Sequence, residues 1–321
     1  MKIAICHTKI GIDADGVYMA WENAAKFHGD TPIHCFSLQD FKNSAADVAV
    51  MVSYPHFGSP HRLIDEYDFL QKEVVTSRID SNPINIFRRE VLSICNLKHI
   101  RPIFIDSGII KCNRERNGNK NNHYQVGYDC IKGLGEYYNQ NMPDDRFKKL
   151  EIELAPWRTP NKNCLMFGQL PFGIGTQHID IRAWYRYCLT YFKDNRISVF
   201  YCEHPNVEHA FTHHKYRIKN ISYKDRTNEK IGFAIAFSSN AIVDAIVNGI
   251  PPIAMSQLSP AYKVCTKDFT EYEQIKLFDR EKWLSDMAYT QWSINEMESG
   301  ECWNHLRPHA QKPANAIYPL C

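Results

Sequence analysis

Polar side chains that suit a phosphate or sugar ligand follow an apolar segment late in the chain. The run 233–237 has the length and composition of a buried parallel strand, and Ser238, Ser239 and Asn240 follow it directly. These residue types commonly begin helices, and ligands of open α/β sheets bind at the carboxyl ends of the strands. Asp244 would lie one turn into the following helix, where its carboxylate could accept hydrogen bonds from ribose hydroxyls. An ordinary strand–helix crossover has the same pattern, so both interpretations remain open at this point.

Comparable residues follow other predicted strands in the same half of the chain. Gly168 and Gln169 come after one apolar run, His204 follows another, and His178 lies in a neighbouring loop. Glycine lets the backbone approach a phosphate, and a histidine can donate a hydrogen bond to it. A single loop histidine is most often only solvated or hydrogen-bonded. Several such residues on successive strand ends predict a nucleotide or nucleotide-sugar site in the second half.

The first half of the chain contains possible acid–base groups at predicted strand ends. Asp106 directly follows an apolar strand, and His7, Asp13 and His56 lie in similar positions. A general base needs a positioned element and must reach the hydroxyl that it deprotonates. We expect Asp106 to be that base, with Asp13 and His7 as alternatives. Asp106 could also simply cap the turn that follows it.

Several function classes are disfavoured by missing motifs. The sequence contains no P-loop motif, no G-x-G-x-x-G after its first strand and no G-x-S-x-G. The segment 11–16 superficially resembles a calcium loop but lacks the full ligand series and the terminal glutamate. We therefore predict that no cofactor is required and that activity is metal-independent or only stimulated by a divalent metal ion.

Composition indicates a globular protein of two domains. The chain has 321 residues, 44% hydrophobic residues and a formal net charge of +2. Its 11 cysteines show no C-x-x-C pair, which argues for reduced thiols. No signal peptide or membrane span is recognised, so we expect a cytoplasmic protein. Alternating short strands and helices predict an α/β fold with parallel sheets, and a proline-rich connector places the boundary between residues 1–158 and 159–321. At the end of the second half, the segments 283–288 and 289–297 read as helices.

Basic residues cluster locally in spite of the small net charge. They lie in a polar loop, at Lys111, Arg114, Arg116 and Lys120. With nearby tyrosines they could grip a phosphodiester backbone. A solvated face balanced by acidic residues elsewhere is an equally good explanation.

Several motifs together resemble the GT-B glycosyltransferases, and most closely the capsule-polysaccharide-type transferases. The segment 238–251 resembles their donor-binding strand–helix unit, with Asp244 in the place of the usual glutamate, and the segments 168–171, 203–205 and 291–300 are also similar. The segments 124–129 and 143–146 look similar to a bacteriophage-associated subset suspected of glycosylating hydroxymethylated DNA bases.

The resemblance implies two Rossmann-like domains facing across a cleft. It implies transfer of a sugar from a nucleotide sugar, expected to be UDP-linked, to an acceptor hydroxyl. We expect the acceptor to be a 5-hydroxymethylpyrimidine in double-stranded DNA, held by the basic loop and His56. Two alternatives are a capsule or lipopolysaccharide glycan acceptor, and a non-catalytic nucleotide- or DNA-binding protein. The donor-binding residues would be Gly168, Gln169, His178, His204, Ser238, Ser239, Asn240 and Asp244.

Overall fold

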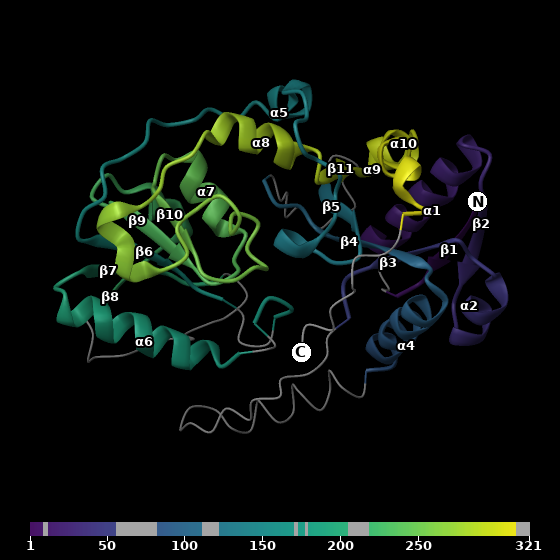
Figure 1. Ribbon diagram of the computed structural model, residues 1–321, viewed down its shortest axis with the longest axis horizontal. Coiled ribbons are helices and arrows are strands. Elements are labelled where there is room, and N and C mark those ends of the chain that lie inside the picture. Colours follow the sequence, from purple (N-terminus) through teal and green to yellow (C-terminus); the bar gives the residue numbers. More distant parts are fainter. Residues whose placement is uncertain are drawn as a thin grey trace. The chain divides into compact units, whose positions relative to one another are not determined.

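The computed structural model contains two compact units (Figure 1). It describes residues 1–8, 12–55, 82–110, 122–169, 173–176, 179–204 and 218–312, except for the side chains of residues 12, 13 and 223. Of these residues, those up to Arg146 and from Leu284 onward form unit 1, and those between form unit 2. Among the described helices, none is both long and apolar enough to cross a membrane.

Unit 1 is built around a six-stranded sheet with the order β11-β5-β4-β3-β1-β2. The strands are β1 (Lys2–Cys6), β2 (Thr31–Cys35), β3 (Val48–Val52), β4 (Arg101–Ser107), β5 (His123–Tyr128) and β11 (Gln291–Ser293). The strands β1 to β4 are parallel, whereas β5 and β11 are antiparallel to their neighbours. Because β1 and β3 are buried along nearly their whole length, they read as continuous apolar runs in the sequence.

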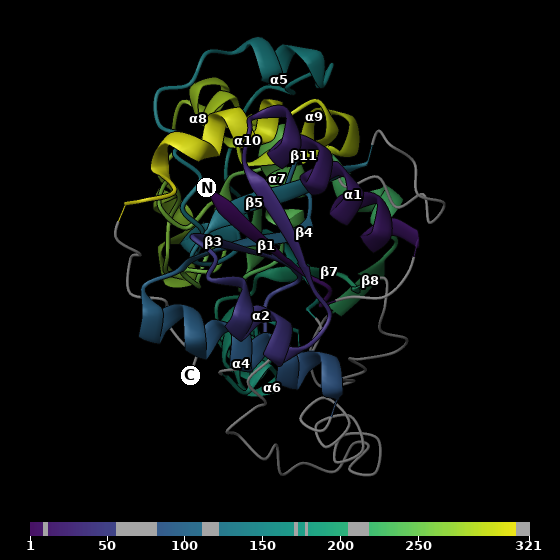
Figure 2. The same cartoon turned by 90° about the vertical axis from the view of Figure 1, so that its right-hand side faces the viewer.

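Helices cover both faces of this sheet. They are α1 (Ile12–Phe27), α2 (Leu38–Ser44), α4 (Pro83–Lys98), α9 (Ile294–Glu298) and α10 (Glu301–Leu306). Figure 2 shows α1, α9 and α10 over one face and α2 and α4 over the other. Trp21 of α1 and Trp303 of α10 meet edge to face in the core between them. The sheet of unit 1 is therefore covered by helices on both of its faces.

Unit 2 contains a five-stranded, entirely parallel sheet with the order β10-β9-β6-β7-β8. Its strands are β6 (Asn163–Phe167), β7 (Ser198–Cys202), β8 (Ile218–Ile221), β9 (Phe233–Ala236) and β10 (Pro252–Ala254). The helix α6 (Ile181–Asp194) buries Leu189 and Phe192 in the core of this unit, and α7 (Ala241–Val247) follows β9. The predicted α/β class with two largely parallel sheets is confirmed.

The C-terminal segment differs from the expectation. The sequence predicted helix over 289–297 within the second half, but residues 291–293 form β11, which pairs with β5 of unit 1. Only α8 (Arg280–Ala288) and α9 are helical there. The reason is that the buried backbone of this three-residue strand hydrogen-bonds with the edge of the unit 1 sheet, a pairing that side-chain spacing does not reveal.

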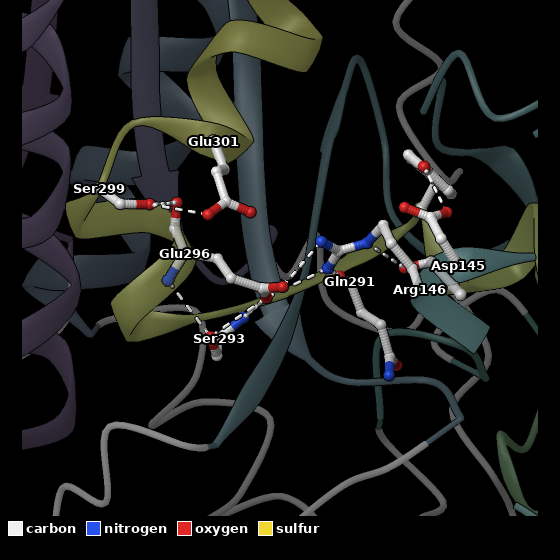
Figure 3. Close-up of polar contacts among 9 residues, drawn as sticks. Asp145, Arg146, Gln291, Ser293, Glu296, Ser299 and Glu301 are labelled. Atoms are coloured by element: carbon white, nitrogen blue, oxygen red, sulfur yellow. Dashed lines mark hydrogen bonds and ion pairs between the residues drawn. The ribbon is translucent and has the colours of Figure 1, made fainter. Parts of the chain in front are cut away.

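Arg146 fastens this segment to unit 1 (Figure 3). Its guanidinium forms an ion pair with Glu296 (Nη1–Oε1 2.7 Å), donates to the carbonyl oxygen of Gln291 at 2.8 Å and lies 3.8 Å from the ring centre of Trp292. Glu296 in turn accepts a hydrogen bond from the backbone N–H of Ser293, completing a capping box at the start of α9. The contacts thus join two segments, 143–146 and 291–300, that the sequence comparison had singled out separately.

Candidate functional site

Buried hydrogen bonds join the carboxyl ends of the neighbouring strands β6 and β9. The side-chain oxygen of Gln169 lies 3.0 Å from both the backbone nitrogen and the hydroxyl of Ser238, and both groups donate toward it. The Ser238 hydroxyl is also 2.9 Å from the carbonyl oxygen of Gly175, which brings the loop 173–176 to the same point. Gln169 and Ser238 are 5% and 2% exposed. These contacts therefore hold the ends of β6 and β9 together in the interior of unit 2, below the solvent-facing surface.

Gly168 follows β6 and lies against the end of β7. A Cβ atom on this residue would lie 2.7 Å from the backbone nitrogen of His204 and 2.8 Å from the hydroxyl of Tyr201. Its own N–H donates to the carbonyl oxygen of Cys202 at 2.7 Å. Only a residue without a side chain fits here, and the close approach places the backbone of His204 beside the end of β6.

An arginine that the sequence did not place in the site lies beside Asp244. The Nε of Arg226, in the turn of 3-10 helix Tyr223–Thr227 after β8, is 3.8 Å from the Asp244 carboxylate on α7. Burial raises the pKa of Cys202 to about 11, Arg226 opposes this shift, and Asp244 and Glu203 add to it. A guanidinium that pairs with a partly exposed carboxylate at the ends of parallel strands can give up that carboxylate and bind the phosphate of a ligand instead.

Ser239 and Asn240 have a more local role. The hydroxyl of Ser239 accepts a hydrogen bond from the backbone N–H of Ala241 at 3.2 Å, and Asn240 occupies the N-cap position with φ −64° and ψ −20°. Gly249 adopts a left-handed φ of 69° just after the end of α7, a conformation that favours glycine. These contacts agree with an ordinary strand–helix connection at this one point.

Several residues expected in the site fall outside the part of the chain that the structure describes. They are His178, His56, Lys111, Arg114, Arg116 and Lys120. For Asp13 only the backbone, in α1, is described. The roles expected for these residues stay predictions.

In unit 1, Asp106 and His7 lie at the same edge of the sheet, as expected from the sequence. Asp106 is the penultimate residue of β4, and its carboxylate accepts a hydrogen bond from the backbone N–H of Ser107 at 2.7 Å. Burial lowers the pKa values of Arg88 and Lys132, and the negative charge of Asp106 opposes both shifts. Arg88 in turn donates to the carbonyl oxygen of the residue after His7. This edge thus combines the carboxylate of Asp106, the cations Arg88 and Lys132, and the imidazole of His7.

The imidazole of His7 is held on several sides. Its Nε2 lies 2.8 Å from Nδ1 of His34, and His34 Nε2 lies 3.1 Å from the carboxylate of Glu22. The ring centres of Tyr18 and Phe36 lie 4.3 Å and 4.1 Å from the ring centre of His7. The sequence had not connected His34 or Glu22 with the site. Among the described residues, no group of three or more His, Cys, Asp or Glu side chains is arranged so that it could hold a metal ion.

Comparison with known proteins finds similarity in structure only. No protein-family model matches the sequence, and no curated protein matches it significantly. The fold is similar to that of Thermosulfurimonas dismutans KpsC described as a beta Kdo 2,4 transferase, with a TM-score of 0.50, 10% identity and coverage of 93% of this chain and 98% of that chain. It is similar to KpsC of the same organism described as a beta Kdo 2,7 transferase, with a TM-score of 0.50, 11% identity and coverage of 96% and 100%.

At this identity the likeness is one of fold, and it agrees with the predicted GT-B-like arrangement of two largely parallel sheets. Neither structure bears on the expected similarity to a bacteriophage-associated subset.

Proposed function

We propose that this protein is a glycosyltransferase that moves a sugar from a nucleotide sugar to a hydroxyl of a glycan. The observation that carries the proposal is the convergence of Gly168, Gln169, Ser238 and the Arg226–Asp244 pair on the carboxyl edge of the unit 2 sheet. Parallel α/β sheets bind ligands at this edge. The fold shared with two Kdo transferases supports the same reaction class.

In this proposal unit 2 holds the donor. Arg226 would exchange part of its contact with Asp244 for the phosphate, and His204 would donate to the same group. Positive groups placed at the leaving phosphate stabilise the charge that develops there as the glycosidic bond breaks. Asp244, once released, would accept hydrogen bonds from the ribose. Gly168 and Gln169 would keep the strand ends close enough for the backbone to reach the ligand.

A glycan acceptor has more support than DNA. Both similar structures are described as beta Kdo transferases, and the cations Arg88 and Lys132 at the unit 1 edge suit an anionic glycan. The basic loop that motivated the DNA acceptor lies outside the described residues. We therefore place the capsule-type glycan first, and we leave the nucleotide of the donor to experiment.

The test is a transfer assay read by mass spectrometry. Purified protein is incubated with UDP-, CMP- and GDP-linked sugars and two acceptors, an acidic oligosaccharide primer and duplex DNA that contains 5-hydroxymethylcytosine. The proposal predicts a mass increase of one sugar residue on the primer, lost in Arg226→Gln and kept in Lys193→Gln, which removes an exposed charge from the same unit. A mass increase on DNA alone would overturn the glycan acceptor, and no increase on either would count against a transferase.

A further inference from the structure

Two cysteines lie opposite each other in neighbouring strands of unit 1. Cys6 is the last residue of β1 and Cys35 is the last residue of β2, and the parallel register pairs them directly. Neighbouring strands lie about 4.8 Å apart, which falls within the range of Cα separations that a disulfide can bridge. Ile5 belongs to the core beneath α1, so Cys6 points to the other face of the sheet, which α2 and α4 cover (Figure 2).

The thiols of this pair are hydrogen-bonded to each other. Both cysteines are free, and Cys35 Sγ also donates to the carbonyl oxygen of Ile33 at 3.7 Å. The hydrogen bond from Cys6 lowers the pKa of Cys35, although burial and Asp40 oppose this shift. Burial raises the pKa of Cys6 well above its ordinary value, and the hydrogen bond with Cys35 adds to this rise. Cys35 is therefore the more acidic thiol, and the thiolate is the form that oxidants attack.

This arrangement distinguishes the pair from the other described cysteines. Among the strand pairs that the structure describes, only β1 and β2 place one cysteine opposite another. Cys164 of β6 and Cys188 of α6 interact electrostatically in unit 2, but burial raises the pKa of both, so neither supplies an acidic thiol. These two cysteines provide an internal control.

The position of Cys35 favours local opening, although its side chain is completely buried. The strand β2 lies at the edge of the sheet, and the residues before Cys35 are exposed or half-buried. Phe36, the next residue along the chain, is 69% exposed. Segments with few buried contacts open at a lower free energy than the core of a protein. Opening of this strand end would admit a small oxidant such as hydrogen peroxide.

We propose that Cys6 and Cys35 form a reversible disulfide when the protein meets a peroxide, and that this bond holds β2 against β1. In the first step Cys35 takes one oxygen atom from hydrogen peroxide, whose O–O bond breaks, and a sulfenic acid and one water molecule form. The Cys6 sulfur then attacks the Cys35 sulfur, and the hydroxide that leaves combines with the Cys6 proton as a second water molecule. Two thiols are thus oxidised by two electrons, and the peroxide is reduced to water. A small dithiol reverses the change and becomes a disulfide itself.

The first test identifies the bond. The full chain is treated with a small excess of hydrogen peroxide, denatured in the presence of N-ethylmaleimide to block every remaining thiol, and digested for mass spectrometry. We expect a peptide pair joined through Cys6 and Cys35, lighter by two hydrogen atoms than the separate peptides and split by dithiothreitol. Cys35→Ser should abolish this product, and Cys188→Ser should leave it unchanged. Both thiols blocked by maleimide in the treated wild-type protein, or a bond from Cys6 to Cys95, would overturn the proposal.

The second test measures the effect on the edge strand. Hydrogen–deuterium exchange is compared between peroxide-oxidised and dithiothreitol-reduced wild-type protein. We expect slower exchange in peptides that contain residues 31–36 after oxidation, and no such difference in Cys35→Ser treated in the same way. Peptides from β8, an edge strand of the unit 2 sheet, serve as the control and should exchange equally in both forms. Equal exchange of residues 31–36 in the two forms of the wild-type protein would show that the disulfide does not hold β2 in place.

Discussion

The side chain of Gln169 holds the backbone and the hydroxyl of Ser238 at 3.0 Å each, and so links the ends of β6 and β9 in the interior of unit 2. Both residues are almost fully buried. Gln169→Ala would leave the Ser238 N–H without its acceptor, and we expect the free energy of unfolding to fall by about 1–3 kcal/mol. Urea denaturation measures this loss.

The exposed Gln274 of the same unit provides the matched control. Gln274→Ala should change the free energy of unfolding by less than about 0.5 kcal/mol. Equal losses in the two variants would show that the Gln169–Ser238 contact does not hold the strand ends together.

Gly168 should not tolerate even one added methyl group. Gly168→Ala would press a Cβ against the backbone of His204 and the hydroxyl of Tyr201, and we expect a loss of about 1–3 kcal/mol together with weaker donor binding. Gly16→Ala, inside α1, meets only Ile294 at 3.6 Å and should stabilise the protein by about 0.5–1 kcal/mol. Thermal denaturation of both variants separates the cost of the steric clash at residue 168 from the effect of replacing glycine with alanine as such.

Arg226 should contribute to donor affinity more than to stability. Arg226→Gln removes a charged hydrogen-bond donor to phosphate, which is worth about 1.5–3 kcal/mol, so the Kd of a nucleotide sugar should rise roughly ten- to a hundredfold. Isothermal titration calorimetry measures this change. An unchanged Kd would remove Arg226 from the phosphate site and leave it as a partner of Asp244 alone.

Arg146 should be one of the most destabilising positions to truncate. Arg146→Ala deletes the ion pair with Glu296 and the bond to the Gln291 carbonyl in a largely buried setting, with an expected cost of about 3–5 kcal/mol. Arg186→Ala, whose 3.8 Å ion pair with Asp180 is much more exposed, should cost less than about 1 kcal/mol. Similar losses in urea denaturation would contradict the anchoring role of Arg146.

Stability should fall as the pH falls below the ordinary histidine range. Burial lowers the pKa of His305 and the nearby Arg146 charge lowers it further, although its bond to the Tyr137 carbonyl opposes the shift. Between the folded pKa and 6.5 the unfolded chain binds more protons, so the free energy of unfolding decreases as pH falls through that window. The loss between pH 7.5 and 5.5 should be smaller in His305→Gln, and an equal loss would exclude His305 as its source.

The strands of both sheets could largely be predicted because buried parallel strands are short apolar runs. The segments 48–52 and 233–236 are examples, and the polar residues that follow 233–236 correctly indicated one sheet edge. The strand 291–293 could not be predicted, because three residues carry no periodicity and their partner β5 lies far away in the sequence. The antiparallel β5 itself reads as a polar segment with one apolar face.

Contacts between side chains of distant elements were also beyond the sequence. The chain from Glu22 through His34 to His7 depends on the register of β1 with β2 and on the face that α1 presents to the sheet. The approach of Arg226 to Asp244 depends in the same way on where the chain turns after β8. Residue types predicted which groups could act, and tertiary structure determined their partners.

The central claim is that a nucleotide sugar binds at the carboxyl edge of the unit 2 sheet. Hydrogen–deuterium exchange of the wild-type protein, with and without a saturating nucleotide sugar, tests it most directly. The account predicts slower exchange in the peptides that contain residues 168–169, 203–204 and 238–244, and much weaker slowing there in Arg226→Gln when both proteins are compared at a ligand concentration near the wild-type Kd. Slower exchange confined to other segments would contradict it.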